Sequence, residues 1–132
     1  MNSNHAASTL PTVYIVERDT SVRRALTRLM QSEGYGNESF SSVDAFLESS
    51  FSHDNACIVA DVDVPGISAL ELPERLRQIG ANLPIVFLAT DYRDETRERI
   101  RRAGGSGYFG KPVDGNALLD MIRWTTNGKY SV

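Results

Sequence analysis

A continuous apolar run, Cys57 to Ala60, ends in the carboxylate of Asp61 and is soon followed by Pro65 and Gly66. A short unbroken run bounded by a turn signal is typical of a strand that is buried on both faces of a parallel sheet. Residues that end such strands lie at the carboxyl edge of the sheet, where open α/β folds bind ligands. The run therefore predicts a covered parallel sheet and makes Asp61 a candidate site residue.

Five apolar or β-prone segments, this run included, are each followed by a predicted helix, in which apolar residues repeat with helical spacing except in the charged segment at 93–103. The predicted strands span residues 13–16, 37–40, 57–61, 84–89 and 107–109, and the predicted helices span 22–30, 43–47, 70–79, 93–103 and 117–124. Pro73 is expected in the first turns of its helix, because a proline deeper inside would remove a backbone hydrogen bond. Alternation of this kind implies right-handed crossovers and a parallel sheet covered on both faces. The simplest solution is a flavodoxin-like doubly wound (βα)5 fold of the α/β class, with a five-stranded parallel sheet of order 2-1-3-4-5.

The chain is expected to form one domain, because its 132 residues match the usual size of a single domain. We expect this domain at residues 11–125, between a flexible N-terminal tail at 1–10 and a C-terminal tail at 126–132. Acidic residues outnumber basic ones and the net charge is −3, which argues against direct binding of nucleic acid. Cys57 is the only cysteine, and no apolar run is long enough for a membrane span or a signal peptide. These features predict a cytoplasmic protein without a membrane partner.

In the predicted strand order, polar residues that follow the strands converge at the carboxyl edge of the sheet. They are Glu17, Arg18 and Asp19 after the first strand, Asp61 and Asp63 at the third, Ala89, Thr90 and Asp91 at the fourth, and Lys111 after the fifth. Carboxylates gathered in one cleft repel one another, which favours a hard divalent cation with oxygen ligands, first of all Mg²⁺. A carboxylate beside a cation and a lysine is also arranged to attack a phosphoryl group, because both positive charges offset charge on the transferring oxygens.

Several motifs occur together in a specific order. An acidic turn follows the strand at 13–16 and precedes the segment Val22-Arg23-Arg24-Ala25-Leu26, Asp61 precedes Pro65-Gly66, and Ala103-Gly104 stands seven residues before the pair Lys111-Pro112. With this order and spacing, residues 11–125 resemble the receiver domains of bacterial two-component response regulators, particularly those of the nitrogen-fixation and nodulation type. The resemblance covers nearly the whole predicted domain.

The resemblance implies roles for individual residues. Asp61 would accept a phosphoryl group from a partner sensor histidine kinase, and Lys111 would contact the phosphoryl oxygens. The bond from Lys111 to Pro112 is usually cis in the family. Tyr108 would be the switch aromatic of the last strand.

The chain departs from the family pattern at two important positions. Arg18 stands where receivers carry an acidic residue that is a direct Mg²⁺ ligand, and a guanidinium cannot bind a cation. Two alternatives follow: Arg18 acts as a built-in cation that pairs with Asp61, or a weakened Mg²⁺ site is formed by Glu17, Asp19, Asp61 and the backbone carbonyl of Asp63. Ala89 occupies the place of the switch Thr or Ser, and Thr90 is displaced from that place by one residue. Because side chains alternate along a strand, Thr90 does not simply replace it.

The leading functional hypothesis is a single-domain response regulator of a phosphorelay that accepts a phosphoryl group on Asp61 and signals through protein contacts. It would have no enzymatic activity beyond self-phosphotransfer and autodephosphorylation. Its expected partners are a sensor histidine kinase, a downstream target or phosphotransfer protein, and a second copy that would dimerise through the helix at 93–103, the strand at 107–109 and the helix at 117–124.

Two other hypotheses belong to different classes. Arg18 and Ala89 favour a pseudo-receiver, a protein-interaction module that works without phosphorylation, whereas Asp61 and Lys111 argue against it. A flavodoxin-like enzyme or nucleotide binder that shares only the fold ranks last, because no glycine-rich phosphate loop follows the first strand.

Overall fold

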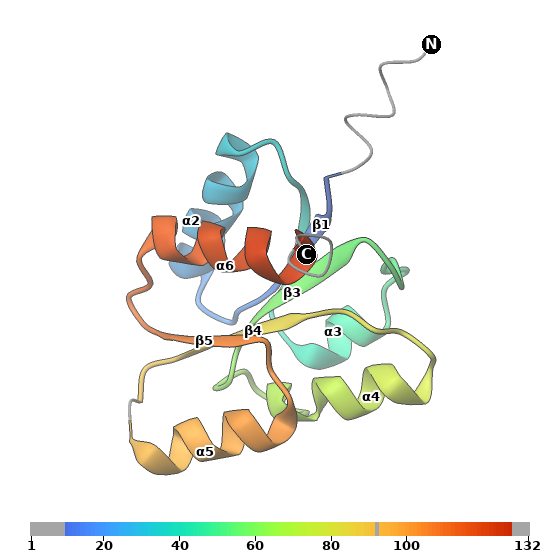
Figure 1. The fold of residues 1–132 in the computed structure, drawn as a ribbon, viewed down its shortest axis with the longest axis vertical. Coiled ribbons are helices and arrows are strands. Elements are labelled where there is room, and N and C mark those ends of the chain that lie inside the picture. Colours follow the sequence, from blue (N-terminus) through green and yellow to red (C-terminus); the bar gives the residue numbers. More distant parts are fainter. Residues whose placement is uncertain (1–9, 92, 128–132) are drawn as a thin grey trace.

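Five parallel strands form one sheet in the order β2-β1-β3-β4-β5, and helices cover both of its faces (Figure 1). The computed structural model describes residues 10–91 and 93–127 of the 132-residue chain. The strands are β1 (Thr12–Val16), β2 (Gly36–Phe40), β3 (Ala56–Asp61), β4 (Ile85–Ala89) and β5 (Gly107–Gly110). The helices are α2 (Thr20–Ser32), α3 (Val43–Leu47), α4 (Leu72–Gln78), α5 (Asp94–Ala103) and α6 (Gly115–Asn127), and the 3₁₀ helix η1 (Ala69–Glu71) precedes α4. The predicted fold class and strand order are confirmed.

The burial of each strand follows its place in the sheet. Every residue of the central strand β3 is buried, as the apolar run predicts. β2 is an edge strand that pairs only with β1, and its polar sequence is mostly exposed. In the register of β1 and β3, Val16 lies opposite Ala60, so Glu17 follows β1 at the level of Asp61. The sheet thus brings these two carboxylates together.

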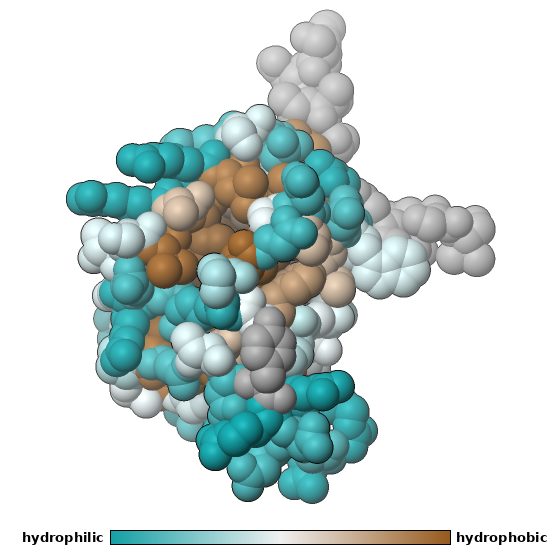
Figure 2. All heavy atoms as spheres, turned by 90° about the vertical axis from the view of Figure 1, so that its left-hand side faces the viewer, coloured by the Kyte–Doolittle hydropathy of each residue, from teal (hydrophilic) through white to brown (hydrophobic). Residues whose placement is uncertain are grey.

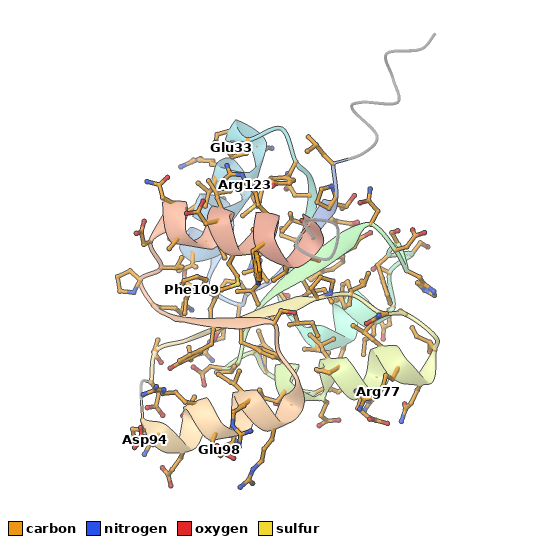
Figure 3. The ribbon with its side chains drawn as sticks, in the orientation of Figure 1. Glu33, Arg77, Asp94, Glu98, Phe109 and Arg123 are labelled. Atoms are coloured by element: carbon orange, nitrogen blue, oxygen red, sulfur yellow. The ribbon has the colours of Figure 1, made fainter. Side chains whose placement is uncertain are left out.

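The helices form two layers, one on each face of the sheet. α2 and α6 pack on one face and α3, α4 and α5 pack on the other (Figure 1). The first layer buries Leu26 and Met30 of α2 with Leu118 and Ile122 of α6, and an ion pair of 3.1 Å joins Arg123 of α6 to Glu33 after α2 (Figure 3). In the second layer the fully buried side chains include Phe46, Leu72 and Leu76.

Local signals explain where the helices begin and end. Asp19 caps α2 by accepting a hydrogen bond from the backbone N–H of Val22 at 3.1 Å. Pro73 lies in the first turn of α4, as predicted, and the preceding residues form η1. Gly104 ends α5 in the left-handed conformation, with φ of 93°, which a residue without Cβ adopts easily.

The last helix is longer than the sequence predicts. α6 ends at Asn127, beyond the helix predicted at residues 117–124, and the domain bounds of 11–125 stay a prediction. Nothing in the sequence indicates that the helix continues, because Thr125 and Thr126 are polar and are weak helix formers. Residues 1–9 and 128–132, which make up most of the two predicted tails, lie outside the described residues. Within residues 10–91 and 93–127, no helix is long and apolar enough to cross a membrane.

Candidate functional site

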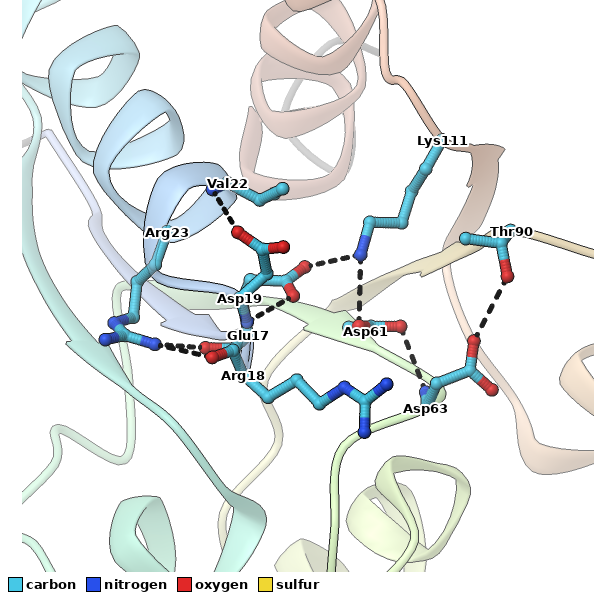
Figure 4. A network of polar contacts seen from close by, with 9 residues as sticks. All are labelled: Glu17, Arg18, Asp19, Val22, Arg23, Asp61, Asp63, Thr90 and Lys111. Atoms are coloured by element: carbon cyan, nitrogen blue, oxygen red, sulfur yellow. Dashed lines mark hydrogen bonds and ion pairs between the residues drawn. The ribbon is translucent and has the colours of Figure 1, made fainter.

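An open polar pocket lies at the carboxyl edge of the sheet. Its lining consists of Glu17, Arg18, Asp19, Asp61, Asp63, Thr90 and Lys111 (Figure 4). These residues come from the ends of β1, β3, β4 and β5, which are far apart in the sequence. These seven predicted residues therefore lie together, whereas Ala89 and Asp91, which were predicted at the same edge, do not line the pocket.

Lys111 bridges the two buried carboxylates of the pocket. Its Nζ atom lies 2.9 Å from Oε1 of Glu17 and 3.1 Å from Oδ2 of Asp61. The Glu17 side chain is 1% exposed and that of Lys111 is 15% exposed, so water screens these contacts weakly. Burial acts to lower the pKa of Lys111, but its hydrogen bonds to both carboxylates outweigh that effect and raise the pKa overall. Lys111 is therefore a fixed positive charge beside Asp61.

Burial also perturbs Glu17. It raises the pKa of this carboxyl group above its usual value, although the hydrogen bond from Lys111 opposes the change. The second oxygen of Glu17, Oε2, accepts a hydrogen bond from the backbone N–H of Asp19 at 3.0 Å. Both oxygens of Glu17 thus have protein donors.

Asp61 is held at the end of β3 with both oxygens oriented. Oδ2 faces Lys111, and Oδ1 accepts a hydrogen bond from the backbone N–H of Asp63 at 3.0 Å. The side chain is 3% exposed, yet it lines the open pocket. A ligand that enters the pocket therefore meets a carboxylate of defined orientation beside an ammonium group.

Arg23 fixes the loop between β1 and α2. Its Nη1 atom donates hydrogen bonds to the carbonyl oxygens of Glu17 at 2.7 Å and of Arg18 at 3.3 Å. Sequence reasoning did not assign this role to Arg23. The available signal was its position one helical turn after Asp19, from which a long side chain can reach back to the start of the helix.

Arg18 lines the pocket without a partner of its own in the described part of the chain. The residue is exposed, and its guanidinium makes no hydrogen bond or ion pair within residues 10–91 and 93–127. In Figure 4 the side chain extends below Asp61 in the direction of Asp63. The direct pairing with Asp61 that one hypothesis predicts is therefore not present in this arrangement.

The carboxylates predicted as metal ligands are engaged by protein groups in this arrangement. Glu17 and Asp61 are bridged by Lys111, and Asp19 uses Oδ1 as the N-cap of α2. In the described ranges, no group of three His, Cys, Asp or Glu side chains is placed to hold a metal.

The predicted switch residues are Ala89, which ends β4, Thr90, which follows it, and Tyr108 of β5. Ala89 is fully buried, whereas the hydroxyl of Thr90 points into the pocket and donates to Oδ2 of Asp63 at 3.4 Å. Tyr108 donates from its hydroxyl to the carbonyl oxygen of Asp91 at 2.8 Å, and the bond from Lys111 to Pro112 is cis, as the resemblance implies. Roles of these residues in a switch stay predictions.

The side chain of Asp91 organises the start of α5. It accepts hydrogen bonds from the backbone N–H of Arg93 at 2.7 Å and from the hydroxyl of Thr96 at 2.8 Å. These two bonds hold the pKa of Asp91 below its usual value. Thr96 is buried and was not singled out from the sequence, where it stands inside a charged helix.

An apolar recess adjoins the polar pocket. It lies between the first turns of α2 and the loop after β5, and its apolar lining is Val22, Ala25, Leu26, Leu88, Pro112 and Val113. The side of the molecule that carries this loop shows apolar surface surrounded by hydrophilic side chains (Figure 2). Asp19, Thr90 and Lys111 line both hollows, so the two are continuous.

Comparison with known proteins identifies the family. Residues 13–123 match the sequence profile of the response regulator receiver domain. The chain belongs to this family. Receiver domains are signalling modules of two-component systems, and they generally bind Mg²⁺ at their acidic pocket. The predicted resemblance to nodulation and nitrogen-fixation receivers is confirmed by the relatives.

Two curated relatives illustrate the match. Nodulation protein W of Bradyrhizobium diazoefficiens is 33% identical over 116 residues, which cover 88% of this chain and 51% of the relative. The transcriptional regulatory protein FixJ of Azorhizobium caulinodans is 31% identical over 111 residues, which cover 84% of this chain and 53% of the relative. The receiver chain thus spans about half the length of these relatives.

Solved structures agree with the fold. The response regulator StyR superposes with a TM-score of 0.81 at 35% identity, and the match covers 92% of this chain and 61% of that one. A receiver protein from Burkholderia phymatum gives a TM-score of 0.75 at 29% identity, with 89% of this chain and 95% of that chain covered.

Proposed function

We propose that this receiver domain accepts a phosphoryl group on Asp61 from a sensor histidine kinase and signals through protein–protein contacts. The observation that carries the proposal is the contact of 3.1 Å between Nζ of Lys111 and Oδ2 of Asp61 at the floor of an open pocket. It supplies an oriented nucleophile and a positive charge at the same place.

The transfer joins a carboxylate oxygen of Asp61 to the phosphorus of a phosphohistidine in the donor. The bond between phosphorus and the imidazole nitrogen breaks, and its electron pair stays on the imidazole. During transfer Lys111 offsets charge on the phosphoryl oxygens, because its ammonium group is held next to the attacking carboxylate. The product is an acyl phosphate on Asp61.

Arg18 supplies the second positive charge in this proposal. Its guanidinium lines the pocket and is not engaged by any carboxylate of the described residues, so it is available to phosphoryl oxygens. A guanidinium binds such oxygens through paired N–H groups. Arg18 thereby supplies part of the positive charge that Mg²⁺ supplies in other receivers.

The docking surface for the phosphodonor is proposed at the apolar recess beside the pocket. Val22 and Ala25 of α2 and Val113 after β5 line this recess, and a helix of the donor that covers it would bring its histidine to Asp61. A downstream target, a phosphotransfer protein or a second copy would then bind the surface of α5, β5 and α6.

Incorporation of acid-labile phosphate from a small-molecule phosphodonor, with and without excess Mg²⁺, tests the proposal. Wild type is compared with Asp61→Asn, Arg18→Asp and the control Asp120→Asn, whose side chain is 80% exposed on α6. We expect label in wild type and in the control, none in Asp61→Asn, and little dependence on Mg²⁺. Arg18→Asp should lose label without Mg²⁺ and regain it with Mg²⁺.

Other outcomes would change the proposal in defined ways. Label that requires both Asp61 and Mg²⁺ in wild type would keep the phosphoacceptor and remove the cationic role of Arg18. No label in wild type, with label in Arg18→Asp plus Mg²⁺, would overturn phosphorylation of the native domain. That result would support the interaction module that works without phosphorylation.

A further inference from the structure

A second polar hollow lies on the other side of α2, between this helix and the edge strand β2. Three arginines of α2, Arg23, Arg24 and Arg28, line it together with Thr20, Thr27 and the hydroxyl of Ser39 from β2. No acidic side chain contributes to the lining. The hollow therefore combines guanidinium groups with hydroxyl donors, which are the groups that bind oxyanions.

The positive charge of this hollow is not offset by neighbouring side chains. Arg24 and Arg28 make no hydrogen bond or ion pair within residues 10–91 and 93–127, and Arg23 donates only to oxygens that carry no formal charge. Helix α5 differs, because Glu98 pairs there with both Arg101 and Arg102. The arginines of α2 are thus available to an external anion.

The strand beside the hollow adds no acid either. Phe40 of β2 packs into the core on the side of α3. Side chains alternate along a strand, so Glu38, two residues earlier, points to the same side as Phe40 and away from α2. Ser39, between them, faces the arginines.

The arrangement of positive charges on α2 lowers the stability of this helix. Arg24 and Arg28 are like charges at the i, i+4 spacing, which destabilises a helix. Arg23 and Arg24 also lie near the helix N-terminus, where the helix dipole disfavours cations. Residues 20–32 contain no Asp or Glu, and Asp19, the N-cap of α2, is the acidic residue next to this end of the helix. A bound anion would relieve both effects.

The length of the hollow indicates an extended ligand. It extends from Thr20 to Gln31, a rise of about 16 Å along the helix axis. That distance matches roughly five extended residues of a polypeptide. An extended segment with several acidic side chains would complement the arginines along this length.

We propose that the hollow between α2 and β2 binds an acidic segment of a partner protein, whose carboxylates pair with Arg24 and Arg28. β2 has a neighbouring strand on one side only, so its outer side does not obstruct the approach of such a segment. This interaction is independent of phosphorylation on Asp61.

The test uses a peptide of about ten alternating Glu and Ser residues, added to the whole protein at low ionic strength and followed by backbone amide NMR shifts. A peptide with Gln in place of Glu and an oligothymidylate of similar length are the comparison ligands. We expect shifts around Arg24, Arg28 and Ser39 with the acidic peptide. The double variant Arg24→Gln with Arg28→Gln should bind about fivefold to tenfold more weakly, since two exposed ion pairs are lost.

Two controls separate this interaction from other effects. Arg101→Gln with Arg102→Gln removes the same charge from α5 and should leave peptide affinity unchanged, as should Asp61→Asn, so failure of the phosphorylation proposal does not affect this one. The α2 double variant should melt no lower than wild type, because repulsion between Arg24 and Arg28 is removed. Absence of peptide binding to wild type, equal binding by the α2 variant, shifts confined to α5, or tighter binding of the oligothymidylate would each overturn the proposal.

Discussion

At the scale of single residues, one ammonium group holds two buried carboxylates together. Lys111 contacts Glu17 and Asp61, so the three side chains carry one net negative charge in a weakly screened place. Removal of the cation leaves two buried carboxylates that repel each other. The stability of the fold and the reactivity of Asp61 therefore depend on the same lysine.

Replacement of Lys111 by methionine should destabilise the protein by about 2 to 3 kcal/mol near neutral pH. The value lies below that of a wholly buried pair because Lys111 keeps 15% exposure. Without the lysine, Glu17 loses the hydrogen bond that opposes the rise of its pKa, so it binds a proton more tightly in the folded state and the loss of stability should shrink as the pH falls. Urea unfolding at several pH values measures this loss of stability. The double variant Lys111→Met with Glu17→Gln should regain part of it. An equal deficit at all pH values would contradict this account.

The raised pKa of Glu17 has its own consequence. A carboxyl group with a raised folded-state pKa contributes stability below its ordinary pKa of 4.5, and this stability is lost as the pH rises through the folded-state value. Glu17→Gln removes that loss and keeps an acceptor for Lys111. Relative to wild type, the variant should therefore gain stability as the pH is raised from about 4 to 7. Urea unfolding across this range provides the measurement, with exposed Glu38→Gln as the control that should show no such gain.

The residue scale also shows what the sequence could and could not predict. Strand ends fix which residues share an edge, so Asp61, Lys111 and Glu17 were placed together correctly. Partners within the pocket depend on side-chain torsions that strand order does not determine. The bridge from Lys111 to Glu17, the loop contacts of Arg23 and the direction of the Arg18 side chain became visible only in three dimensions.

At the scale of elements, the connection from α5 to β5 is packed closely against the sheet. A Cβ atom at Gly105 would lie 2.6 Å from Cδ2 of Phe87, a fully buried ring of β4. A Cβ atom at Gly107 would lie 2.8 Å from Sδ of Met121, which belongs to a flexible side chain of α6. The two glycines thus face neighbours of different rigidity.

Alanine at these two positions should therefore have unequal effects. Gly105→Ala forces a buried ring or its strand to move and should cost about 1 to 3 kcal/mol, as overpacking in cores does. Gly107→Ala should cost less, because the end of Met121 can adopt another rotamer. Thermal and urea unfolding of both variants compare them, and the addition of Phe87→Leu should reduce the cost at Gly105. A larger loss at Gly107 would refute the argument.

Whole elements were predicted better than their ends. The alternation of predicted strands and helices identified the five strands and the five α-helices, including the short α3, the charged α5 and the polar strand β2. Pro73 was placed in the first turn of its helix, but the η1 turn before it has no clear sequence signal. The C-terminal end of α6 was missed because threonines carry little helical preference, although the hydroxyls of Thr125 and Thr126 donate to the carbonyl oxygen of Ile122 in the same helix.

At the scale of the whole molecule, the sheet is shared by two separate cores. Leu76 of α4 is buried on one face and Leu118 of α6 on the other, and the strands between them supply side chains to both layers. The pocket at the carboxyl edge is built from loops that lead into both layers. Loss of packing on either face should therefore lower the free energy of unfolding of the entire domain.

A truncation in one layer tests this coupling. Leu76→Ala should cost about 2 to 4 kcal/mol, because it removes a fully buried side chain and leaves a cavity. If the domain unfolds as one unit, the most protected amides of α6 must lose the same free energy of protection as those of α4, although no α6 contact has changed. Native-state hydrogen exchange measures both sets, and Leu118→Ala is the reciprocal variant. Unchanged protection of α6 in Leu76→Ala would mean that the two layers unfold separately, and the pocket would then open without loss of the whole fold.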